Sequence, residues 1–237
     1  MMTAKKHNLK FAWFSSLAVV IMTVITWGFA MVAVPPAGPF CPGDCMEYPF
    51  SDLLDYYPRD YYWMYLAILQ VFTYILFMVS NYFIAREEKK IYGFSSVTFS
   101  IISAVVLLIA YFVQFSVVPV SMMKGETEGI ALLTQYNGHG IFIALEELAY
   151  ITMSISFLFL AFVFPRVTRL EKAIRLVLLA AFPLIFMAFV IYTLRYGIER
   201  SYRFEVVASR VNWMVTISTG ILLSKYFRKH LRVLKMD

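Results

Sequence analysis

The chain has 237 residues, of which 61% are hydrophobic and only 15% are charged. An ordinary soluble domain has about 25% charged residues, so this composition excludes a soluble globular protein and indicates an integral membrane protein. The net charge of +6 does not indicate nucleic-acid binding, because the basic residues lie in short clusters beside apolar runs, as membrane orientation requires.

The apolar runs predict six membrane-spanning helices. Each run has the length of about 20 residues that crosses a bilayer, and backbone groups in lipid must satisfy their hydrogen bonds within the segment, which favours helices. The first run follows a basic segment, as a signal peptide does, but it is too long for one and is expected to remain as a span. The predicted fold is all-α, a six-helix bundle that forms a single membrane domain over residues 1–237. Its spans are expected at residues 11–34, 61–85, 94–119, 139–164, 173–195 and 205–226.

Lysine and arginine in the connections predict the orientation. Both termini and the connections at 86–93 and 165–172 are basic, whereas the loop at 35–60 is acidic and the loop at 120–138 has a single base, Lys124. Positively charged connections stay in the cytoplasm, so both termini are expected there. The last outer connection departs from this rule with Arg195, Arg200 and Arg203. Either these bases pair with neighbouring acids, or the last two spans are misplaced.

The only two cysteines, Cys41 and Cys45, flank a Pro-Gly pair in the first outer loop. An oxidising compartment outside the membrane would allow them to form a disulfide, with free thiols as the alternative. No histidine lies nearby, and two thiolates supply only half of the four ligands that zinc takes, so no metal is expected.

Polar residues recur at helical spacing in three spans. The seam in the second span includes Gln70, the seam in the third includes Gln114, and the seam in the sixth includes Asn212, with Arg210 about a quarter turn away. Such seams either line a polar cavity or join membrane helices to each other by hydrogen bonds. Helical spacing alone leaves both interpretations open.

The fourth span carries two adjacent carboxylates, Glu146 and Glu147. A charged side chain at the centre of a membrane helix costs about 2.5–3.5 kcal/mol or more, so a functional site is the first hypothesis. His139 and Tyr150 share the helix side of Glu146, and Glu147 lies on the adjacent side. The structural alternative is an ion pair between one glutamate and Arg210, which would leave the other acid without a partner.

Three functions are compatible with these features. The first is binding or transport of a proton, cation or small solute in an outward-facing polar cavity. The second is a non-catalytic subunit or sensor whose seams bind partner helices. The third is an intramembrane enzyme that modifies a lipid or isoprenoid-like substrate with a neutral glutamic acid as proton donor. The cavity would be lined by Glu146, Glu147, Arg210, Asn212, Gln114, Gln70, Tyr150 and His139.

No zinc-protease, nucleotide-binding, serine-hydrolase or calcium-loop motif is present, so a non-enzyme is favoured and the question of catalysis stays open. No cofactor is expected. The expected partners are the lipid bilayer and a small solute or proton, with a second copy or another membrane protein as further candidates. The sequence resembles small polytopic proteins of bacteria and archaea in its general character, and the expected location is a prokaryotic plasma membrane.

Overall fold

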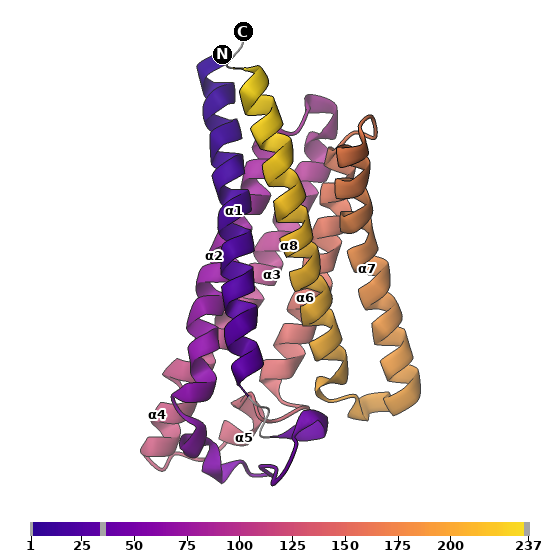
Figure 1. The fold of residues 1–237 in the computed structure, drawn as a ribbon. Coiled ribbons are helices and arrows are strands. Elements are labelled where there is room, and N and C mark those ends of the chain that lie inside the picture. The colour runs from indigo at the N-terminus through magenta and orange to yellow at the C-terminus, as the bar shows by residue number, and fades with distance from the viewer. Residues whose placement is uncertain (1, 34–36, 235–237) are drawn as a thin grey trace.

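The structure, a computed structural model, describes residues 2–33 and 37–234. In these residues the chain forms helices and loops and no strand, which confirms the all-α prediction. Six of the helices in the described residues are long and apolar enough to cross a membrane, as a multi-pass membrane protein requires. These helices are α1 (Met2–Val32), α2 (Tyr62–Ile84), α3 (Lys90–Ser116), α6 (Ile141–Val163), α7 (Arg169–Tyr196) and α8 (Tyr202–Val233) (Figure 1).

Each predicted span corresponds to one long helix, but several boundaries differ. The third span was expected to reach residue 119, whereas α3 ends at Ser116 and a short helix, α4 (Val118–Met123), follows. α1 begins before residue 11 and α8 continues beyond residue 226, because the flanking Lys and Arg residues are good helix formers. Residue 34, the predicted end of the first span, lies outside the described residues.

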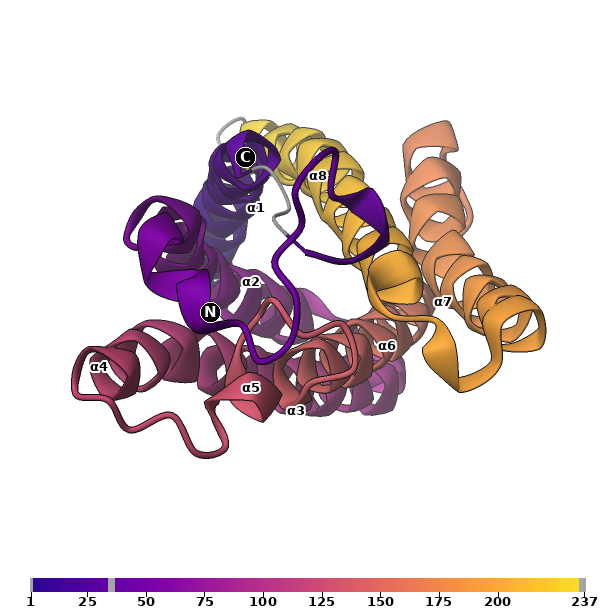
Figure 2. The same cartoon turned by 90° about the horizontal axis from the view of Figure 1, so that it is seen from below.

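The bundle has two different ends. α1 begins and α8 ends at the same end, which we call the terminal end (Figure 1). The opposite end, the loop end, holds residues 37–61, α4, the short helix α5 (Ile130–Leu133) and the connection at 197–201. Seen from the loop end, the chain between α1 and α2 crosses the bundle, and α7 lies at the periphery (Figure 2).

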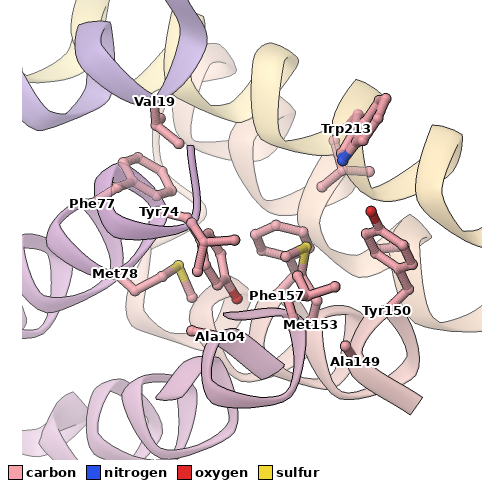
Figure 3. Packing of buried hydrophobic residues seen from close by; sticks show 14 of the residues in the cluster. Val19, Tyr74, Phe77, Met78, Ala104, Ala149, Tyr150, Met153, Phe157 and Trp213 are labelled. Atoms are coloured by element: carbon pink, nitrogen blue, oxygen red, sulfur yellow. The ribbon is translucent and has the colours of Figure 1, made fainter. Parts of the chain in front are cut away.

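Large buried side chains fill the centre of the bundle. Tyr74 and Phe77 from α2 and Met153 and Phe157 from α6 are fully buried and belong to one cluster (Figure 3). The Tyr74 hydroxyl lies 2.6 Å from Ser156 Oγ, so a hydrogen bond between polar side chains joins α2 directly to α6. The exposed faces carry many large apolar side chains, as lipid-facing surfaces do.

The loop end is held together by local bonds. Cys41 and Cys45 form a disulfide, the pairing expected from the sequence. Gln114 of α3 donates from Nε2 to the Leu133 carbonyl at 2.6 Å, and its Oε1 accepts from the Gln135 amide at 2.8 Å. These bonds fix α5 and the chain after it against α3, so the loops form an ordered cover over this end of the bundle.

Candidate functional site

A cavity of about 210 Å³ lies between α1, α2, α6 and α8 near the loop end. One water occupies about 30 Å³ of liquid volume, so the cavity has room for several waters or one small solute. Its wall combines aromatic rings with a few ionisable side chains. The lining includes Trp27, Phe40, Asp60, Trp63, Gln135, Tyr136, Phe142, Glu146, Tyr150, Tyr202, Glu205, Ser209, Arg210 and Trp213.

Glu146 is the more buried of the two acids on α6. It comes five residues after the first residue of the helix, about 8 Å along the axis, and is only 4% exposed. Its Oε1 accepts a hydrogen bond from the Tyr111 hydroxyl at 3.0 Å, and that hydroxyl lies 3.1 Å from the hydroxyl of Tyr150. Among the described residues, no Lys, Arg or His lies within ion-pair distance of Glu146. A buried carboxyl therefore faces the cavity beside two tyrosine hydroxyls.

Glu147 is in a different environment from its neighbour. Its carboxylate receives two hydrogen bonds from Arg200, from Nε at 3.2 Å and from Nη2 at 2.6 Å. Glu147 is not part of the cavity wall. The hydrogen bond to Glu147 raises the pKa of the Arg200 guanidinium, which keeps this base charged. Of the two glutamates predicted to line a cavity, the structure thus places Glu146 on its wall and Glu147 outside it.

The ion pair also corrects the expected partner, since Arg200 and not Arg210 binds the glutamate. α7 ends at Tyr196, and Gly197 has a positive φ of 60°, which turns the chain from α7 towards α8. This turn places Arg200 beside Glu147 and 4.9 Å from the Phe189 ring. The ion pair with Glu147 thus accounts for Arg200, one of the three arginines in the last outer connection that depart from the rule that basic connections stay in the cytoplasm.

α8 contributes a second acid to the cavity. Glu205, Ser209 and Arg210 all line it, and Glu205 is only 9% exposed. Arg210 is exposed and has no ion pair among the described residues. The sequence places Glu205 in the polar seam of the sixth span, but Glu205 was not among the predicted site residues; it lies in the first turn of α8. Its spacing of four residues from Ser209 was the available signal.

Several predicted site residues lie outside the cavity wall. Gln70 donates to Thr23 Oγ1 at 3.4 Å, and Asn212 donates to the carbonyls of Tyr150 and Ala208 at 3.0 and 2.9 Å. Gln114, as described above, holds the chain around α5. His139 is exposed just before α6. The amide side chains in the three seams therefore join helices and loops, whereas Glu146, Tyr150 and Arg210 line the cavity.

A second polar group borders the cavity at the loop end. Asp60 is 3% exposed, and its Oδ1 accepts from Arg59 Nε at 2.6 Å. The other oxygen of Asp60, the hydroxyl of Tyr136 and Nε2 of Gln135 are buried and have no hydrogen-bond partner among the described residues. Burial also raises the pKa of the Tyr136 hydroxyl, so it stays protonated. An unpaired buried polar group costs about 1–3 kcal/mol, and a polar guest in the cavity would remove part of that cost.

Comparison with known proteins gave no match: no family model, no curated protein and no solved structure is significantly similar to this chain. Its function is therefore inferred from the cavity itself.

Proposed function

We propose that this multi-pass membrane protein binds, and in that way senses or transports, a proton, cation or small solute in the cavity at Glu146. One observation carries the proposal: Glu146 is a buried carboxyl on the wall of a cavity, and no base among the described residues lies within ion-pair distance of it. A carboxyl at this depth is expensive unless it is compensated. Water, a proton or a positively charged guest in the cavity supplies that compensation.

The polar seams support this function over a role as a docking surface for partner helices. The amide nitrogens of Gln70, Gln114 and Asn212 all donate within the chain. These three side chains are also 2% exposed or less, so a partner helix packed on the outside of the bundle would not reach them. The carboxyl of Glu146 instead faces a space large enough for a guest.

We further propose that the loop end faces outward across a plasma membrane and that both termini are cytoplasmic. The basic connections before α3 and before α7 lie at the terminal end, where positive charge is retained. The disulfide between Cys41 and Cys45 lies at the loop end, and disulfides persist in oxidising compartments. In this orientation the cavity is nearer the outer surface.

Thiol accessibility tests whether water-soluble molecules reach the cavity. The two native cysteines form a disulfide, so a single engineered cysteine is the only free thiol. Ser209→Cys places this thiol on the cavity wall, and Ser103→Cys is the matched control, because Ser103 is buried between α3 and α6 and donates to the Ala149 carbonyl at 2.8 Å. A membrane-impermeant methanethiosulfonate is added to intact cells.

We expect Ser209→Cys to react and Ser103→Cys to stay unmodified until the protein is denatured. Lys124→Cys, in an exposed loop at the loop end, serves as the positive control for access from outside. If Lys124→Cys reacts but Ser209→Cys is as protected as Ser103→Cys, the cavity is closed to water-soluble guests and the proposed function is wrong.

A further inference from the structure

We propose that the cavity selects a small organic ammonium ion, whose charge lies against Glu146 and Glu205 and whose alkyl groups pack against tryptophan rings. This inference rests on the proposed function and names the class of its ligand. It is carried by the charge balance of the wall, by the rings that surround the acids, and by the cavity volume.

The charge of the wall favours a monovalent cation. Three carboxyl groups line the cavity, those of Asp60, Glu146 and Glu205, together with one base, Arg210. Asp60 has its own partner in Arg59, at 2.6 Å. When Glu146 and Glu205 are both ionised, they and the guanidinium of Arg210 leave one negative charge, which a single positive charge on the guest would balance.

The aromatic part of the wall favours an organic cation over a hydrated inorganic one. Three of the four tryptophans of the chain line the cavity: Trp27 from α1, Trp63 from α2 and Trp213 from α8. The rings of Trp27 and Trp213 meet edge to face with centroids 5.9 Å apart, so the wall is continuous from α1 to α8. Tryptophan faces attract cations most strongly among the aromatic side chains, and groups of such rings recognise methylated ammonium groups.

Tyr150 extends the aromatic wall onto α6. Its ring belongs to the buried cluster, and its hydroxyl points toward the α8 side of the bundle, where Trp213 lies (Figure 3). That hydroxyl is 3.1 Å from the Tyr111 hydroxyl, which donates to Glu146. Glu146 and the hydroxyls of Tyr111 and Tyr150 therefore form one hydrogen-bonded group at the aromatic wall.

The described residues do not favour a metal ion as the guest. They contain no group of three or more His, Cys, Asp or Glu side chains arranged to hold one. Hard divalent cations take six or more oxygen ligands, and the cavity wall instead consists mainly of aromatic and aliphatic side chains. A trimethylammonium group needs few directed ligands, because it has no N–H to donate, and a molecule of the size of choline fits within about 210 Å³.

Intrinsic fluorescence provides the readout, since most of the tryptophans lie at the site. The purified full chain in lipid nanodiscs is titrated with choline and, separately, with 3,3-dimethylbutan-1-ol, which has the same shape without the charge. Potassium chloride at equal ionic strength controls for salt. We expect a saturable change with choline at a concentration about tenfold below that needed for the neutral alcohol, and no saturable change with potassium.

Two neighbouring glutamates provide a matched pair of variants. Glu146→Gln removes the cavity charge and is expected to weaken choline binding about tenfold, towards the level of the neutral alcohol. Glu147→Gln removes an adjacent charge that lies outside the cavity wall and is expected to leave choline binding unchanged. Size-exclusion chromatography checks that both variants fold. If Glu146→Gln does not fold, Glu205→Gln replaces it with the same expectation.

Three results would overturn the inference: an equal response to choline and the alcohol, no response to choline, or equal weakening by both glutamate variants. The thiol experiment separates this failure from failure of the proposed function. If Ser209→Cys reacts but choline gives no response, the cavity is open to solutes and only the ammonium ligand is wrong. If Ser209→Cys does not react, both the proposed function and the ammonium ligand are wrong.

Discussion

Glu146 and Glu147 are consecutive in α6, yet their carboxylates meet different neighbours. A rotation of 100° per residue places Glu146 toward the cavity and Glu147 toward the connection between α7 and α8. There Arg200 binds it with two nearly parallel hydrogen bonds, the geometry that makes Arg–carboxylate pairs strong. Glu146 thus faces the cavity, whereas Glu147 joins α6 to the connection between α7 and α8.

The structural role predicts coupling between Glu147 and Arg200. Hydrogen bonds to charged groups contribute about 1.5–3 kcal/mol, so Glu147→Gln and Arg200→Gln should each lower the free energy of unfolding by about 2 kcal/mol. The double variant should lose clearly less than the sum, because each single change already removes the pair. Unfolding in mixed micelles of mild detergent and sodium dodecyl sulfate measures all three. Strictly additive losses would show that the pair contributes nothing.

At the level of elements, close approach of helices depends on small residues at particular positions. A Cβ on Gly220 of α8 would lie 2.5 Å from Val20 Cγ2 and 3.0 Å from the Ser16 carbonyl oxygen, both on α1. The backbones of α1 and α8 therefore come together where a side chain has no room, as small residues allow in membrane bundles. This contact holds α1 against α8 on the terminal-end side of Trp27 and Trp213, the two tryptophans that line the cavity from these helices.

Gly220→Ala should therefore destabilise the bundle. Overpacking of this kind typically costs about 1–3 kcal/mol. Gly28→Ala is the matched control, because a Cβ there meets no atom within 4 Å, and it should be neutral or slightly stabilising, since alanine is the better helix former. Thermal denaturation in detergent compares the two. Equal melting temperatures would mean that α1 and α8 do not pack as described.

At the level of the whole molecule, the charge distribution predicts how the bundle lies in the membrane. Lys124→Cys at the loop end and Lys229→Cys near the end of α8 are both exposed and lie at opposite ends. An impermeant thiol reagent should modify Lys124→Cys in intact cells and Lys229→Cys only after permeabilisation. The reverse pattern would place both termini outside and move the cavity to the cytoplasmic half.

Much of this architecture could be predicted from sequence because apolar run length is nearly sufficient to define membrane helices. The cost of burying charge also indicated the Glu146 region. The partner Arg200 could not be predicted, since it depends on the turn at Gly197. Helical spacing showed that Gln70, Gln114 and Asn212 share faces with other polar residues, but it does not show which neighbour a face meets. Helical spacing alone therefore cannot distinguish a polar face that packs against another helix from one that lines a cavity.

Of the two adjacent glutamates, only Glu146 lies on the cavity wall, and we propose that aqueous solutes reach it there. Carboxyl labelling tests it directly: the protein in native membranes is treated with a small water-soluble carbodiimide and an amine, and modification is located by mass spectrometry. We predict modification at Glu146 that choline suppresses, with little at Glu147, which Arg200 holds. Modification of Glu147 in preference to Glu146, or of neither while exposed loop acids react, would contradict the account.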